Sequence, residues 1–204
     1  MTARLFRSGA RRRIGIGWWG ARWQALFDAG PLGLGSLAAH GHADALAIWA
    51  SLDGKPLLID AGTYAYHEDP AWRDHFRSTP AHNTLTLDGR NQSEIQGAFL
   101  WGRKARSRFV AHDLRAGWVE GETDAYLPDT ITRRVQLTGD ALTMRDRVRR
   151  DAPGAIIACA PDDLRVACGD GALRLLEVQP ESRPRMDSRA FINGYRPQVG
   201  EQFG

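Results

Sequence analysis

The sequence is poor in lysine, in cysteine and in long hydrophobic runs. Lys55 and Lys104 are the only lysines among 27 basic residues, and 24 acidic residues are interspersed with the arginines. Nucleic-acid-binding proteins usually gather their cations on one face, so mixed charges argue against that class. No apolar run is long enough to span a bilayer, and the stretch after residues 11–13 is too short for a signal peptide. Two cysteines, Cys159 and Cys168, could pair across a late hairpin, but they fix neither redox state nor location.

Arginine supplies almost all of the positive charge. Its planar guanidinium binds carboxylate and sulfate groups through two parallel hydrogen bonds, which would suit an acidic polysaccharide. A general bias of the proteome toward arginine, alanine and glycine explains the same composition. Both interpretations stay open.

The 22 glycines and 10 prolines predict many short elements separated by turns. No repeat, heptad or alternation of strands with helices is visible. We therefore expect an all-β fold, an antiparallel β-sandwich in layers. Residues 1–24 are expected to form a basic lead-in or an edge strand, residues 25–180 the β-sandwich domain, and residues 181–204 an irregular tail.

Several strands can be placed from apolar runs and turn residues. Residues 24–28 predict one strand, followed by a flexible loop at 30–35. Residues 43–52 and 56–59 predict a hairpin around Asp53 and Gly54, and residues 135–137 should return through residues 142–148. Residues 70–80 lack alternation, so we expect a loop or one helical turn.

One cluster of residues could bind a metal. In an extended segment, His40, His42 and Asp44 lie on one face because side chains alternate with period two. Asp60 ends the second strand of the predicted hairpin, and His82 enters the following one. Two imidazoles and one carboxylate form a common open zinc site.

Whether Asp60 can join the histidines depends on the hairpin register. A two-residue loop at Asp53 and Gly54 makes cross-strand partners sum to 107, which turns Asp60 away from His42. A three-residue loop, or an equivalent bulge, makes the sum 108 and brings Asp60 to the face of the even-numbered residues. We favour the second register because only it lets the cluster converge.

Two other metalloenzyme classes fit parts of this pattern. His42, Asp44 and His82 imitate the two-histidine, one-carboxylate triad of non-haem iron oxygenases, in which Asp44 rather than Asp60 would be the ligand. A cupin is a second near match, although no glutamate follows His40 and His42 at the required distance.

Five blocks between residues 27 and 101 resemble the heparinase II/III-like family of polysaccharide lyases. They are Phe27–Ser36, Ala39–Leu46, Leu58–Tyr66, Phe76–Thr84 and Asn91–Glu94. The resemblance implies layered β-sandwich domains preceded by a helical toroid, with the active site where the two parts meet. No region of this chain could be that toroid, so stand-alone activity is in doubt.

The resemblance also implies roles for individual residues. His42, Asp60 and His82 would be zinc ligands, and His40 a catalytic histidine. Tyr64 would bind substrate near the metal through its hydroxyl, and a buried aromatic residue is the alternative. Arg73 and Arg77 are candidates for contacts with acidic sugars, or for a solvated loop face.

The implied reaction is β-elimination at a uronic acid in an acidic polysaccharide, in the periplasm or outside the cell. A non-catalytic carbohydrate-binding or structural β-module is the alternative.

Overall fold

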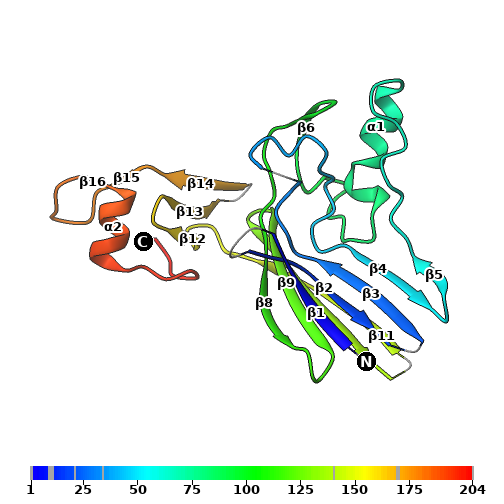
Figure 1. The fold of residues 1–204 in the computed structure, drawn as a ribbon. Coiled ribbons are helices and arrows are strands. Elements are labelled where there is room, and N and C mark those ends of the chain that lie inside the picture. Colours follow the sequence, from blue (N-terminus) through cyan, green and yellow to red (C-terminus); the bar gives the residue numbers. More distant parts are fainter. Residues whose placement is uncertain are drawn as a thin grey trace. The chain divides into compact units, whose positions relative to one another are not determined.

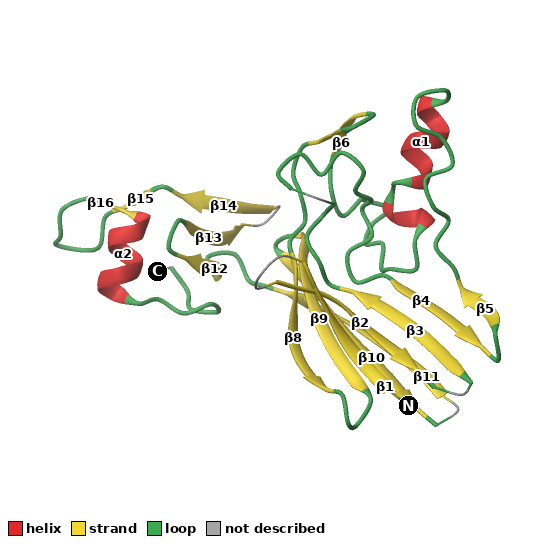
Figure 2. Ribbon diagram, in the orientation of Figure 1, coloured by secondary structure: helices red, strands yellow, loops and turns green. Residues whose placement is uncertain are grey.

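The computed structural model describes residues 2–8, 12–20, 22–33, 35–139, 141–168 and 171–203. The chain divides into two compact units, residues 1–125 with 131–148, and residues 126–130 with 149–204. Antiparallel strands dominate both units, and two short α-helices lie within the described residues (Figures 1 and 2). The expected all-β fold is confirmed.

A five-stranded antiparallel sheet opens the first unit, in the order β1-β2-β3-β4-β5. Its strands are β1 (Thr2–Ser8), β2 (Arg12–Trp19), β3 (Trp23–Asp28), β4 (Ile48–Leu52) and β5 (Lys55–Leu58). The segment 1–24, expected as a lead-in or an edge strand, therefore supplies β1 at the sheet edge, all of β2 inside the sheet and the first two residues of β3.

A second antiparallel sheet follows the order β11-β10-β9-β8. Its strands are β8 (Ser107–Asp113), β9 (Trp118–Tyr126), β10 (Asp129–Thr138) and β11 (Ala141–Arg150). The predicted return from residues 135–137 to residues 142–148 is present as the β10 and β11 pair. Inward-facing residues alternate along β9 and β10, while β11 is largely exposed and rich in arginine, as suits an edge strand.

The core of the first unit lies between these two sheets. The rings of Phe27 on β3 and Phe109 on β8 meet edge to face with centroids 5.9 Å apart. Gly121 on β9 lets them approach, since a Cβ there would lie 2.7 Å from Leu46 Cδ2. Ile16, Trp18 and Val119 are fully buried in the same unit. The loops that leave β3 and β5 carry most of the predicted site.

The hairpin of β4 and β5 settles the register question. Asp53 and Gly54 both have positive φ, as a two-residue type I′ turn requires. Leu52 pairs with Lys55, but Ala50 pairs with Leu58, so a bulge adds one residue to β5. The equivalent bulge that we favoured is therefore present, although β5 ends at Leu58, two residues before Asp60.

Short elements cover the loops beyond β5. Helix α1 (Pro70–Phe76) begins at the N-cap Asp69, whose carboxylate accepts from two backbone N–H groups, with proline at the first helical position. It is longer than the single turn expected for residues 70–80. A 3₁₀ turn (Thr79–Ala81) and a small hairpin of β6 (Ile95–Gly97) and β7 (Leu100–Trp101) follow.

The second unit is smaller. It contains the sheet β12 (Ile156–Ala160), β13 (Asp163–Cys168) and β14 (Gly171–Leu175), the pair β15 (Glu177–Val178) and β16 (Met186–Asp187), and helix α2 (Ser188–Tyr195). The expected irregular tail thus holds a capped helix, because Asp187 accepts from the backbone of Ala190. Cys159 and Cys168 are both free thiols, so the disulfide considered from the sequence is absent.

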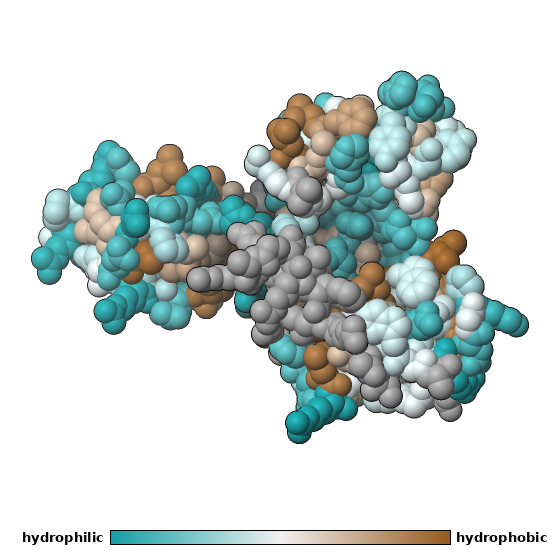
Figure 3. Space-filling model, viewed as in Figure 1, coloured by the Kyte–Doolittle hydropathy of each residue, from teal (hydrophilic) through white to brown (hydrophobic). Residues whose placement is uncertain are grey.

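Charged and apolar side chains are mixed on the surface. On the face drawn in Figure 3, hydrophilic residues intermingle with smaller hydrophobic groups on both units. Within the described ranges, no helix has the length and apolar character needed to cross a membrane.

Candidate metal centre

His42, Asp60 and His82 converge in the first unit. One ligand atom from each lies within 4.8 Å of the others. His82 Nδ1 is 2.7 Å from Asp60 Oδ2, and the two imidazole rings have centroids 5.1 Å apart. His82 Nε2 is buried and has no hydrogen-bond partner in the described part of the chain. Two imidazoles and one carboxylate, with one buried imidazole nitrogen left without a partner, fit a zinc ion.

Backbone contacts hold the Asp60 and His82 segments together. Asn83 Nδ2 donates to the carbonyl of Ile59 at 2.7 Å, which links the residues next to both ligands. Asp60 itself accepts from the backbone of Gly62 through its other carboxylate oxygen. Thr63 Oγ1 lies 3.4 Å from His42 Nε2. The ligand set is therefore supported by neighbours that fix its orientation, as metal sites require.

The His42 segment is an irregular loop whose backbone carbonyls accept hydrogen bonds from side chains that are distant in the sequence. Thr79 Oγ1 donates to the carbonyl of Ala43 at 2.8 Å, and Thr84 Oγ1 donates to that of Ala45 at 2.6 Å. Gln92 Nε2 also donates to Ala45. Regular strand pairing begins only at Ile48, later than the predicted start at residue 43. These threonines and Gln92 lie in the blocks at 76–84 and 91–94, and the sequence alone assigned no role to these three residues.

Arg133 connects this loop to the second sheet. Its Nη1 donates to the carbonyls of Leu46 at 2.9 Å and Asn83 at 2.7 Å. Its Nε and Nη2 form a two-bond pair with Asp146 on β11, at 2.7 and 2.8 Å. One buried guanidinium thus ties both ligand-bearing segments to the sandwich. No feature of the sequence marked Arg133 among so many arginines.

The electrostatics favour metal-binding protonation states. Burial, and then the nearby His82, lower the pKa of His42 to about 4. The imidazole of His42 is therefore neutral at neutral pH, the form that binds a metal. The hydrogen bond from His82 lowers the pKa of Asp60, which keeps its carboxylate ionised.

His40 lies apart from the ligand cluster. It is exposed, and its ring contacts the edges of Tyr66 and Phe99 with centroids 5.7 and 5.8 Å apart. The segment that we expected to be extended therefore places its two histidines in different surroundings. His42 lies with Asp60 and His82, whereas His40 faces solvent next to two aromatic rings.

The three expected sugar-binding residues take other positions. Tyr64 is 73% exposed and its ring stacks on Phe76 of α1, so it is no buried aromatic residue. Arg73 and Arg77 are buried, at 1% and 0% exposure, instead of lining a solvated loop face. Arg77 pairs with Asp74, while Arg73 donates to the carbonyl of Ala98. Direct contact of either guanidinium with a sugar would require this loop to move.

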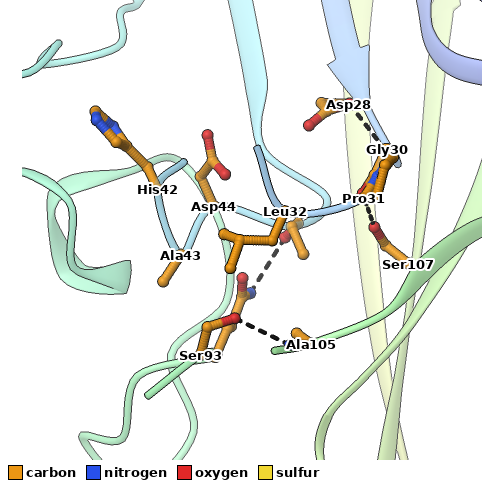
Figure 4. A pocket seen from close by; sticks show the side chains of 12 residues that line it. Asp28, Gly30, Pro31, Leu32, His42, Ala43, Asp44, Ser93, Ala105 and Ser107 are labelled. Atoms are coloured by element: carbon orange, nitrogen blue, oxygen red, sulfur yellow. Dashed lines mark hydrogen bonds between the residues drawn. The ribbon is translucent and has the colours of Figure 1, made fainter. Parts of the chain in front are cut away.

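Asp44 does not contribute to the ligand cluster. It lines a small cavity with Asp28, and Figure 4 shows both carboxyl groups there. Burial raises the pKa of Asp44 to about 7 and that of Asp28 to about 6. The cluster contains Asp60 in place of Asp44, so the geometry does not favour the non-haem iron alternative.

Comparisons with known proteins agree on the fold. The sequence profile described as "Heparinase II/III-like, C-terminal" matches residues 4–187. A crystal structure of heparinase III superposes with a TM-score of 0.55 at 16% identity, covering 88% of this chain and 30% of that chain. Heparan sulfate lyase HepC from Pedobacter heparinus gives a TM-score of 0.51 at 19% identity, covering 86% of this chain and 30% of that one.

A curated protein with a different name also matches. Methionyl-tRNA formyltransferase of Bdellovibrio bacteriovorus is 52% identical over 140 residues, which are 65% of this chain and 40% of that enzyme. This chain thus spans well under half of that relative. The match is local, whereas the profile and the superpositions each cover most of this chain and agree with one another.

Proposed function

The chain belongs to the heparinase II/III-like family through its C-terminal domain, and we propose that it forms the β-sandwich part of a lyase that cleaves uronic-acid-containing polysaccharide by β-elimination. Such a domain would carry a structural zinc site and one catalytic histidine. The observation that supports this most strongly is the arrangement of the two histidines. His42 converges with Asp60 and His82, while His40, two residues earlier, stays exposed.

β-Elimination sets clear demands on the site. The bond between the C5 carbon and its hydrogen breaks, its electrons form the C4–C5 double bond, and the C4–O bond to the leaving sugar breaks. The C5 proton is weakly acidic, so the adjacent carboxylate must be neutralised, and the departing oxygen must receive a proton. No water is consumed.

His40 is suited to this proton transfer. Imidazole is the side chain that most often transfers protons in enzymes, and the exposed ring of His40 lies against the rings of Tyr66 and Phe99. His42, Asp60 and His82 would hold the zinc, which supplies positive charge and fixes the loops when bound. The remaining proton-transfer groups and a helical toroid would come from outside the described residues.

The substrate and location follow from the same family proposal. An arginine-rich protein with an exposed histidine suits an acidic polysaccharide. Polymers of this kind are met outside the cytoplasm, so we propose a periplasmic or secreted protein. No nucleic-acid partner is proposed, because acidic residues are spread among the arginines.

The deciding experiment is an absorbance assay for unsaturated uronate. This chain, alone and joined to a helical toroid from a family member, would be incubated with uronate-containing polysaccharides. We expect a new ultraviolet absorbance in the joined protein. Cleavage without unsaturated product, or no cleavage of any uronate polymer tested, would contradict the proposal.

Carbohydrate binding without catalysis is a second candidate, supported by exposed aromatic rings, one of which, Tyr66, contacts His40. Tyr64, Tyr66 and Trp72 are between 47% and 73% exposed, and such rings stack on sugars. A module of this kind would bind acidic oligosaccharide with unchanged affinity after His40→Ala, and the joined protein would form no unsaturated product.

The zinc site yields a prediction for the chain alone. We expect elemental analysis to find about one zinc per molecule, because the three side chains supply three of the four ligands of a tetrahedral site. Chelation should lower the melting temperature by roughly 5–10 °C, since the metal binds the folded state preferentially. Folded, freshly prepared protein without metal, or chelation without a change in melting, would refute a structural zinc.

A further inference from the structure

We propose that the small cavity lined by Asp28, Asp44 and Gln92 binds one hard cation through oxygen ligands, as a second ion site distinct from the zinc triad. The cavity measures about 10 Å³ and lies between the loop after β3, the His42 segment and the block at residues 91–94 (Figure 4). This volume holds roughly one water-sized particle. The proposal does not depend on lyase activity.

Gln92 is the observation that points to a ligand. Its side chain is 1% exposed, and its Oε1 is buried without a hydrogen-bond partner. The amide cannot simply be reversed, because Nε2 donates to Thr84 Oγ1 and to the carbonyl of Ala45, both at 3.1 Å. Gln92 thus lines the cavity and carries a fixed acceptor oxygen without a donor, and such buried groups are rare unless a ligand completes them.

The two carboxyl groups bring negative charge to the cavity when they are ionised. In the described parts of the chain, neither Asp28 nor Asp44 forms an ion pair with lysine or arginine. Asp28 Oδ1 accepts from the backbone of Gly30 at 2.9 Å, which leaves its second oxygen available. Burying two like charges without a partner is strongly unfavourable. A cation in the cavity would neutralise both carboxylates and give Gln92 Oε1 a partner.

Size and charge together favour calcium. Oxygen ligands alone select hard cations over zinc or copper. Magnesium retains several waters in most sites, and a cavity with room for one particle has no space for them. A monovalent ion would leave one negative charge buried. Calcium matches two carboxylates in charge and accepts the irregular geometry of carboxylate, amide and backbone oxygens.

The experiment is a calcium titration of the zinc-loaded, full chain by calorimetry. We expect one calcium per molecule. Asp28→Asn should weaken calcium binding about 100-fold, because it removes a charged ligand. The zinc content of this variant should stay at one per molecule, which also verifies that it is folded. Asp162→Asn, an exposed carboxylate of the second unit, is the matched control and should bind calcium like the wild type.

His42 also lines the cavity, so an experiment must show that the calcium site and the zinc site are distinct. His82→Ala should lose zinc and still bind calcium, whereas competition between the two ions in the wild type would show a single shared site and overturn the proposal. Melting offers a second readout. Burial raises the pKa of Asp28 to about 6, so without calcium at pH 7.5 an ionised Asp28 is unfavourable and Asp28→Asn should melt higher.

Added calcium should reverse that order by stabilising only the wild type. No calcium-dependent heat or melting shift, or equal calcium binding by wild type and Asp28→Asn, would refute the second site. A loss of zinc binding alone would contradict the proposed zinc site, and the calcium titration could still be interpreted.

Discussion

Replacing His42 with alanine should remove the bound metal and lower the melting temperature, whereas replacing His40 should do neither. His42 lies in the ligand cluster with Asp60 and His82, so its loss breaks a site that links two loops. The ring of His40 lies against the rings of Tyr66 and Phe99, and His40 is exposed. The two variants therefore separate structural and catalytic roles within three residues.

Activity should respond in the opposite way. In the protein joined to a helical toroid, His40→Ala should lower the rate about 100-fold to 10,000-fold, as expected for a positioned acid-base group. His67→Ala removes another exposed imidazole and serves as the control, which should keep metal, melting and rate. Zinc lost from His40→Ala, or full activity of that variant, would contradict the division of roles.

The register of the first hairpin could be predicted because it is a matter of parity. Within the paired strands, period-two alternation fixes which face each residue takes, and an extra residue in β5 gives the register that we favoured. The bulge between Ala50 and Ser51 provides that residue. The type I′ turn at Asp53 and Gly54 was equally readable, because few residue pairs tolerate positive φ twice.

The divergence of His40 and His42 could not be predicted. Alternation was assumed from residue 40 onward, but strand pairing starts at Ile48, and Leu46 has a positive φ of 64°. Such a conformation is costly for leucine and persists only where surrounding contacts determine it. Those contacts come from residues more than 30 positions away, including Thr79 and Thr84.

The burial of Arg73 and Arg77 could not be predicted from the sequence for a related reason. Charged residues on a short, non-alternating segment indicate a solvated loop. In the fold, the guanidinium of Arg73 instead lies over the rings of Tyr66 and Phe99, about 5 Å from their centroids. The guanidinium of Arg77 lies 4.9 Å from the ring centroid of Trp101. Cation–π contacts of this kind depend on tertiary structure, which a local pattern does not encode.

Arg133→Met should be among the most destabilising substitutions in the first unit. It removes both hydrogen bonds to Asp146 and leaves the carbonyls of Leu46 and Asn83 without their donor. The arginine side chain is only 7% exposed and Asp146 is 26% exposed, so solvent replaces these bonds incompletely. We expect a loss of about 3 kcal/mol of folding free energy, measured by urea unfolding.

Arg108→Met on the same sheet is the matched control. Arg108 pairs with Glu122 at 2.9 Å, but its side chain is 69% exposed, so removing it should cost under about 1 kcal/mol. Because Arg133 binds the carbonyl of Asn83, next to His82, its loss should also weaken zinc binding by roughly 10-fold to 100-fold. Equal destabilisation by both substitutions would show that burial does not increase the contribution of Arg133 to the folding free energy. Unchanged zinc affinity in Arg133→Met would show that the metal ligands are positioned without the link to the second sheet.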